Sequence, residues 1–145
     1  MASELSVLSD AVVTELNGAG FSLPFTAARQ YVPQFKLEDL ATLQVVVKPA
    51  GDKRKRASRS TMGRAWTIEI GILQQAGAAA NADLDPLTAL AEEIADHFAL
   101  LNPVIGGSGD VCTDAEIVIL DGTLLAQNAE FHSLIRLTIQ GLRSL

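Results

Sequence analysis

The segment 65–74 carries the strongest pattern in the chain, a strict alternation of apolar and polar residues. Its regularly spaced apolar positions are Trp66, Ile68, Ile70 and Ile72. Successive side chains of a β-strand point to opposite faces, so a period of two predicts a strand with one buried and one solvated face. Any fold for this chain must therefore contain a sheet that is covered on one face, and other segments have to supply the cover.

Two helices are predicted to supply that cover. Apolar residues at helical spacing indicate a helix over residues 3–17, which Ser3 can cap at its start. A second helix is predicted to begin at Asp85-Pro86, after a linker of small residues over 76–84, and to end at Asn102-Pro103. Its expected buried stripe consists of Leu87, Leu90, Ile94, Phe98 and Leu101.

Further strands complete the expected fold. Residues 25–32 are predicted to form an edge strand because Pro24 and Pro33 bracket them. The other predicted strands cover residues 42–48, 115–121 and 133–142, and a flexible glycine-containing loop is expected over 103–113. The order α-β-β-β-α-β-β predicts an α+β fold, with a mainly antiparallel sheet of four to five strands packed with two helices.

The composition fits a single domain over residues 1–145, in which 48% of residues are hydrophobic and 19% are charged. No apolar run approaches the roughly 20 residues that span a bilayer, and the N-terminus lacks the layout of a signal peptide. We therefore expect synthesis in the cytoplasm and no membrane contact. Cys112 is the only cysteine, which excludes an intrachain disulfide and a cysteine-based zinc site.

Charge is distributed very unevenly along the chain. Six of the 11 basic residues lie within positions 53–64, namely Lys53, Arg54, Lys55, Arg56, Arg59 and Arg64. The other 133 residues carry five basic and 17 acidic side chains, a net charge of −12. The basic segment is too long for a tight turn and too polar for a core element. It is predicted to form a long, flexible basic loop, about residues 50–64, between the second and third strands.

Three interpretations of this basic arm stay open. A basic arm on an acidic body is self-complementary between copies, so it can dock on a neighbouring subunit or another partner, and such a head-to-tail contact generates rings. It can also neutralise nucleic-acid phosphates, although it lacks interleaved aromatic residues for stacking. The third interpretation is a solvated loop. The candidate acidic partner surface consists of Glu92, Glu93 and Asp96, which otherwise form a solvated helix face.

Residues with catalytic or metal-binding potential are few and match no motif. His97 and His132 belong to no histidine pair with ligand spacing, and a site that joins them to Cys112 has little support. The glycines of 106–109 are not followed by the lysine of a phosphate-binding loop. We therefore expect no enzyme activity, no cofactor, and no catalytic or metal-binding residues.

Aromatic residues near the predicted edge strand are candidates for the apolar part of an interface. They are needed because exposed ion pairs contribute little affinity. The candidates are Phe21, Phe25, Tyr31 and Phe35, and core packing is the alternative for all of them. The edge strand itself could also pair with the sheet of a neighbouring subunit.

The order of several short segments adds information that no single one provides. They are the apolar run 45–49, the basic stretch 54–59, the strand 66–72, the helix 87–96 and the closing strand 134–139. Over roughly residues 40–140, this arrangement resembles the tail terminator, or tail completion, proteins at the neck of long-tailed bacteriophages. The density of charge in 53–56 departs from the mixed arginine and glutamate stretch of that family.

The resemblance implies a structural protein of the virion, assembled in the host cytoplasm and located at the tail–neck junction. Members form a homo-hexameric ring on the last ring of the tail tube, stop tube polymerisation and present a surface to the head-completion, or connector, protein. By analogy, the basic arm would reach a neighbouring subunit or the tail tube protein, or contact DNA in the lumen. Other head–tail connector or minor tail proteins, and a nucleic-acid-binding module, are the alternatives.

Overall fold

The computed structural model describes residues 3–31, 42–75, 81–101, 104–106, 109–120 and 130–144. Its helices are α1 (Glu4–Gly18), α2 (Asn81–Asp96) and the π-helical turn η2 (His97–Leu101) that continues α2. Its strands are β1 (Ala27–Arg29), β2 (Gln44–Arg56), β3 (Thr61–Gln75), β4 (Val104–Ile105), β5 (Asp110–Leu120) and β6 (Glu130–Ser144). Within these ranges, neither helix has the length and apolar character needed to cross a bilayer.

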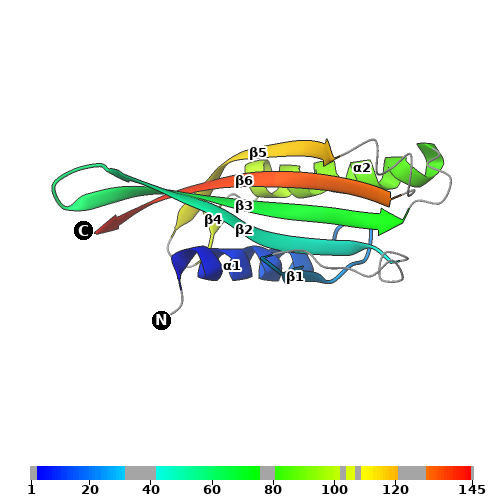
Figure 1. Ribbon diagram of the computed structural model, residues 1–145, viewed down its shortest axis with the longest axis horizontal. Coiled ribbons are helices and arrows are strands. Elements are labelled where there is room, and N and C mark those ends of the chain that lie inside the picture. Colours follow the sequence, from blue (N-terminus) through cyan, green and yellow to red (C-terminus); the bar gives the residue numbers. More distant parts are fainter. Residues whose placement is uncertain are drawn as a thin grey trace.

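The strands form one sheet of six, in the order β1-β2-β3-β6-β5-β4 (Figure 1). All neighbours are antiparallel except β1 and β2, which run parallel. The predicted α+β class with two packed helices is confirmed. The sheet, however, is mixed and has six strands rather than four or five. The additional strand is β4, which lies in the segment predicted to be a flexible loop.

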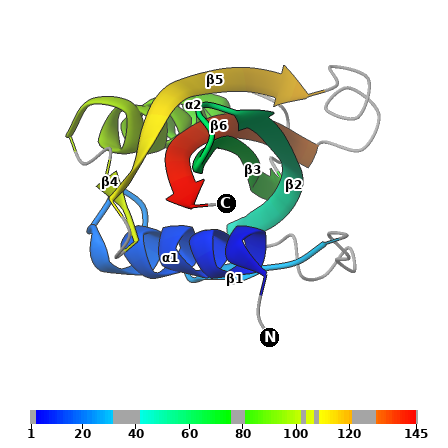
Figure 2. The same ribbon diagram turned by 90° about the vertical axis from the view of Figure 1, so that its left-hand side faces the viewer.

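The sheet is strongly curled, and α1 lies between its two edges (Figure 2). This helix contacts β1 and β2 at one edge and β4 at the other, whereas α2 packs on β5 and β6. Both helices contribute to the same hydrophobic core, so both cover the same face of the sheet. The helix α1 buries Leu8, Val12 and Leu16 in that core.

Local contacts fix both ends of α1. Ser3 Oγ accepts a hydrogen bond from Ser6 N at 3.1 Å, which confirms the predicted cap. The helix ends at Gly18, one residue beyond the predicted range. The Asn17 side chain accepts a hydrogen bond from Ala27 N at 2.7 Å and donates one to Ala27 O at 3.3 Å. This amide fastens the short edge strand β1 to the end of the helix.

The alternation in residues 65–74 is confirmed by the core. Trp66 and the isoleucines at the three following alternate positions are fully buried. The matching positions of β6 are also fully buried, namely Ile135, Leu137 and Ile139. The helix α2 adds Leu87, Leu90 and Ile94, and η2 adds Phe98, as the predicted apolar stripe indicates. Burial of each such side chain contributes about 1.5–3 kcal/mol, so this shared face holds sheet and helices together.

Residues 50–64 form the distal part of the β2–β3 hairpin, so the predicted long flexible loop is wrong. The pairing of β2 with β3 continues to Arg56↔Met62, and β3 is also paired with β6 as far as Thr61↔Ser144. Backbone ladder bonds do not depend on the polarity of side chains. Basic residues on both faces therefore hide the period of two without preventing strand formation.

The helix α2 begins at Asn81, so part of the predicted linker over 76–84 is helical. Pro86 consequently lies inside the helix rather than at its first position. Ala82 and Leu84 are strong helix formers, which favours the earlier start. Residues 76–80 of the linker, and the predicted helix end at 102–103, lie outside the described residues.

The strand β5 also begins earlier than predicted, at Asp110, because it forms a hairpin with β4. Ile105 is paired with Asp110, and Gly106 and Gly109 between them have φ angles of +73° and +76°. Glycine adopts these left-handed angles without steric cost. The predicted glycine-containing loop is therefore partly a hairpin turn, although residues 107–108 lie outside the described residues.

Candidate interaction surface on the basic β-hairpin

The end of the β2–β3 hairpin projects beyond the helices, together with the C-terminal end of β6 (Figure 1). Residues 52–64 are termed the hairpin tip. Its turn is closed by hydrogen bonds from Ala57 N and Ser58 N to Thr61 O, at 3.1 and 3.2 Å. Ser58 Oγ also accepts a bond from Thr61 N at 3.1 Å. The basic residues are thus displayed on an ordered hairpin.

Strand pairing divides the hairpin tip between the two faces of the sheet. Arg54 and Arg64 are paired in the ladder and share the parity of Trp66, so they lie on the face that bears the helices. Lys53 and Lys55 have the opposite parity and lie on the outer face. The two faces have different surroundings and different chemistry.

On the helix-bearing face, Arg64 is buried in a cluster of charges and is only 8% exposed. Its Nε donates to Asp52 Oδ1 at 3.1 Å, and its terminal nitrogens bond Asp52 and Glu4. Its guanidinium carbon lies 5.0 Å from the centroid of the Trp66 ring. Arg64 was predicted to contact a partner, but its side chain is engaged inside the protein.

Arg143 of β6 completes this cluster. Its guanidinium carbon lies 4.9 Å from the Trp66 ring centroid, and its Nε donates to Glu4 at 2.6 Å. Its terminal nitrogens donate to the two Asp110 oxygens at 2.9 and 2.7 Å. Asp110 is buried, so this bidentate pair supplies the partner that a buried carboxylate needs. The cluster joins α1, β2, β3, β5 and β6 at the base of the hairpin tip.

The pKa values in the cluster follow from these contacts. The hydrogen bond from Arg64 lowers the pKa of Asp52, although burial acts in the opposite direction. The same hydrogen bond raises the pKa of Arg64. Hydrogen bonds to Asp110 and then Glu4 raise the pKa of Arg143. Asp52 and both arginines are therefore charged at neutral pH.

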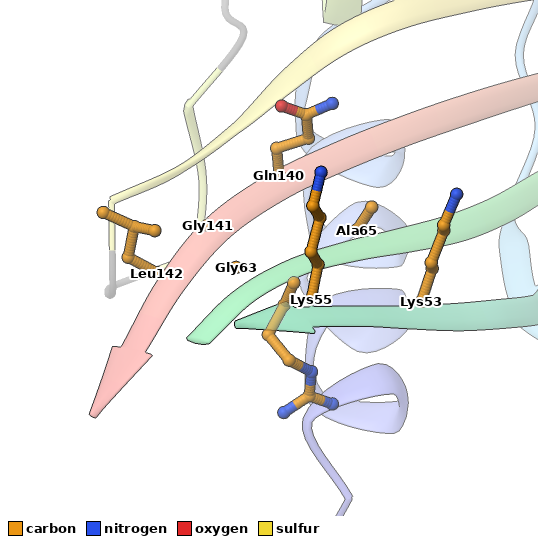
Figure 3. Close-up of a pocket in the computed structure, with 8 residues that line it drawn as sticks. Lys53, Lys55, Gly63, Ala65, Gln140, Gly141 and Leu142 are labelled. Carbon is orange, nitrogen blue, oxygen red and sulfur yellow. The ribbon is translucent and has the colours of Figure 1, made fainter. Parts of the chain in front are cut away.

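On the outer face, the hairpin tip and β6 surround a hollow of about 460 Å³ (Figure 3). Its lining consists of Lys53, Lys55, Gly63, Arg64, Ala65, Gln140, Gly141 and Leu142. Figure 3 shows that Lys53, Lys55 and Gln140 project to the same side. The floor is bare because glycine and alanine lie between these longer side chains. Leu142 is 66% exposed and adds an apolar contact point.

Four cations of the hairpin tip have no acidic partner among the residues that the structure describes: Lys53, Lys55, Arg56 and Arg59. Arg54 is paired with Asp52 at 3.2 Å, but its side chain is 60% exposed. Of the predicted basic contact residues, four are therefore free for a partner, one is weakly held, and Arg64 is buried.

The predicted acidic contact residues are also in different environments. Glu92 and Asp96 are exposed on α2, whereas Glu93 is half-buried. Glu93 accepts hydrogen bonds from the Ser22 hydroxyl and from Ser22 N, the latter at 3.2 Å. The hairpin tip and α2 lie toward opposite ends of the molecule (Figure 1). One copy therefore does not bring the basic and acidic residues together.

His97 and Cys112 both contact other parts of the folded protein. His97 Nε2 lies 2.8 Å from Glu15 Oε1, and its ring packs edge-on against Phe21 and Phe98, at centroid distances of 5.4 and 5.2 Å. Cys112 is buried, and this burial raises the pKa of its thiol. Within the described ranges, no group of three or more histidine, cysteine, aspartate and glutamate side chains could hold a metal ion.

His132 lies far from Cys112 along the sheet. His132 is paired with Leu120 at one end of the β5–β6 ladder, whereas Cys112 is paired with Ile139 near the other end. The structure therefore does not join these two residues into one site.

The aromatic candidates divide between the core and the surface. Phe21 and Phe25 stack at a centroid distance of 5.9 Å and pack against the core, as the core-packing alternative predicts. Tyr31 is 59% exposed, with its hydroxyl 3.1 Å from Ser6 Oγ. Phe35 lies outside the described residues. Tyr31 is therefore the aromatic candidate that the structure leaves available on the surface.

Sequence reasoning missed the acidic half of the cluster and Arg143. One signal in the sequence indicated that the two arginines lie on the buried face of the sheet. Arg64 has the same parity as Trp66 along its strand, and Arg143 has the same parity as Ile139. The residues Glu4, Asp52 and Asp110 carry no comparable signal, since only the tertiary structure brings them to the hairpin.

No protein-family model matches the chain, and no curated protein matches it. A solved structure is similar over 100% of this chain and 96% of its own length, with 15% sequence identity and a TM-score of 0.46. A likeness at this level identifies neither a family nor an activity. The hairpin tip is a candidate site because of its own geometry and charge.

Proposed function

We propose that this chain is a structural neck protein of a long-tailed bacteriophage and acts as a tail terminator. In this role it forms a homo-hexameric ring that caps the tail tube, stops its polymerisation and offers an interface to the head-completion protein. The protein is then a virion component at the tail–neck junction, assembled in the host cytoplasm. It performs no enzymatic reaction and uses no cofactor. The resemblance over residues 40–140 supports this assignment.

The hairpin tip is the observation that carries the proposal. It is a projecting hairpin with four cations that have no acidic partner among the described residues, on a chain with a net charge of −6. A ring requires two different, complementary patches on each copy. The exposed carboxylates of α2, an element outside the hairpin tip, supply a second patch of opposite sign.

Charge pairs at such an interface mainly select the partner and its orientation, and each exposed pair contributes little to the binding affinity. Apolar contact has to add the rest. Leu142 on β6 and Tyr31 after β1 are exposed and can contribute to it. The edge strand β1 is a further candidate for pairing with a neighbouring sheet, although Asn17 already bonds the backbone N and O of Ala27.

Nucleic-acid binding is the second candidate function, and the free cations favour it. Lys53 and Lys55 lie on one face, and Arg56 and Arg59 lie next to the turn, so the group could neutralise backbone phosphates. The hairpin tip contains no aromatic residue for base stacking. Contact with DNA in the lumen of a ring is compatible with both functions.

The test uses the tail tube protein of the phage that encodes this chain. The tube protein is allowed to polymerise with and without the purified chain, and tube lengths are measured by electron microscopy. A terminator binds the growing end, so substoichiometric amounts should shorten the tubes. Tubes of unchanged length at every ratio would contradict the proposal. A bound ring at tube ends, seen in the same images, would support it directly.

A further inference from the structure

We infer that the outer-face hollow of the hairpin tip is a docking site for the α2 helix of a second copy of this chain. The inference rests on the proposed function, because it assigns the two surfaces that meet in the ring. The docking surface on the helix is an exposed stripe of α2, formed by Asp85, Ala89, Glu92 and Asp96.

The hollow supplies two cations at a fixed spacing. Lys53 and Lys55 are two residues apart on one strand, so their side chains leave the same face about 7 Å apart. Neither has an acidic partner among the described residues. The floor between them and β6 consists of glycine and Ala65, and Leu142 is exposed beside it. This surface fits a narrow, partly apolar, acidic element.

The α2 stripe has the matching pattern. Its four residues follow the i, i+4, i+7, i+11 spacing of a single helix face, and all four are exposed. Glu92 and Asp96 are separated by a rise of about 6 Å, close to the separation of the two lysines. Ala89 has little bulk, which lets the helix approach the bare floor. Glu93 lies beside the stripe and is already bonded to Ser22.

A second copy suits the hollow better than a nucleic acid does. A duplex would extend past the hairpin tip and meet the rest of the chain, and the residues outside 53–64 carry a net charge of −12. The α2 stripe carries acidic side chains on a single helix face, and the exposed Leu142 can meet apolar atoms of the helix. Because the hollow and the stripe are two different surfaces of one copy, the contact is head-to-tail and can close a ring.

The experiment uses two charge-reversed forms of the full chain, K53E/K55E and E92K/D96K. In each form alone, the facing surfaces carry like charges. When the two forms are mixed in equal amounts, a hollow and a stripe of opposite charge face each other only where a copy of one form contacts a copy of the other form. The assembled fraction is measured by native mass spectrometry, with one form labelled with ¹⁵N. The matched control is R56E/R59E, which makes the same charge change on the same hairpin but outside the hollow.

We expect each form alone to lose assembly by at least about tenfold, and the mixture to regain it as species with equal numbers of both forms. The control should lose much less. Because the mixture restores assembly, a loss in one form cannot be attributed to misfolding.

If the K53E/K55E form assembles to the same extent as the wild-type chain, this inference is wrong, although the proposed ring is not contradicted. A mixture that fails to assemble would also overturn it. Loss of duplex-DNA binding by K53E/K55E, with assembly intact, would assign the hollow to nucleic acid instead. A wild-type chain that never assembles would contradict the proposed ring itself.

Discussion

Arg64 and Arg143 share one aromatic ring and one carboxylate. Their guanidinium carbons lie 5.0 and 4.9 Å from the centroid of the Trp66 ring, and Glu4 is bonded to both. The arginines come from the neighbouring strands β3 and β6, and Glu4 lies in the first turn of α1. This contact fastens the base of the hairpin tip to the N-terminal helix.

The first prediction concerns the stability of this cluster. Arg143→Met leaves the buried Asp110 carboxylate without its bidentate partner and should lower the free energy of unfolding by about 3 kcal/mol. Arg54→Met is the control, because its single ion pair is exposed, and it should cost less than about 1 kcal/mol. Urea unfolding followed by Trp66 fluorescence measures both. Equal losses for the two variants would contradict the structural role of the cluster.

The second prediction concerns a close approach at Gly141. A Cβ atom there would lie 1.9 Å from Asp110 Oδ1 and 3.2 Å from Trp66 Cζ3. Gly141→Ala should therefore displace the cluster and lower the free energy of unfolding by about 1–3 kcal/mol. A Cβ atom at Gly51 would lie 3.9 Å from its nearest neighbour, so Gly51→Ala should change the free energy of unfolding by no more than about 0.5 kcal/mol. Thermal unfolding of both variants checks this, and an unaffected Gly141→Ala protein would refute it.

The third prediction concerns acid. Arg64 lowers the pKa of Asp52 below the ordinary value of 3.8, so its stabilisation is fully present above that value and is lost as the pH falls through the folded-state pKa. Wild-type protein should therefore lose more stability between pH 5 and acid conditions than Asp52→Asn does. Urea unfolding across this pH range measures the difference. Parallel pH profiles for the two proteins would show that Asp52 makes no such contribution.

The basic hairpin shows where prediction from sequence stops. The alternation of Trp66 and the isoleucines predicts the central strand because one face is apolar and the other polar. In the hairpin tip both faces are basic, so the same period of two leaves no trace in hydropathy. Only the pairing of β2 with β3, and of β3 with β6, reveals that these residues belong to the sheet. The edge strand predicted over residues 25–32 forms only at Ala27–Arg29, and nothing in the sequence indicates that it runs parallel to β2. The two-residue strand β4 is too short to predict from a pattern.

The candidate site was predictable in its charge but not in its division into faces. Sequence reasoning groups all six basic residues, whereas the structure buries Arg64 and leaves Lys53 and Lys55 on the outer face. The assignment follows from register, because Arg64 shares the parity of Trp66. Likewise, the positions of Glu92 and Glu93 in the sequence do not show that Ser22 donates hydrogen bonds to Glu93 and not to Glu92.

The fourth prediction separates these two carboxylates. Glu93→Ala removes the acceptor for Ser22 N and for the Ser22 hydroxyl, and it should lower the free energy of unfolding by about 1 kcal/mol. Glu92→Ala should leave stability nearly unchanged, because Glu92 is exposed, but it should weaken assembly. Urea unfolding and sedimentation velocity distinguish the two effects. A stability loss confined to Glu92→Ala would reverse the assignment.

Native mass spectrometry of the wild-type chain, over a wide concentration range at low and moderate salt, measures whether the chain assembles into a ring by itself. We predict a species of six 15.3 kDa copies, about 92 kDa, whose fraction falls as salt screens the contact between the hairpin tip and α2. A 15.3 kDa monomer at every concentration and both salt levels would contradict a self-assembling ring.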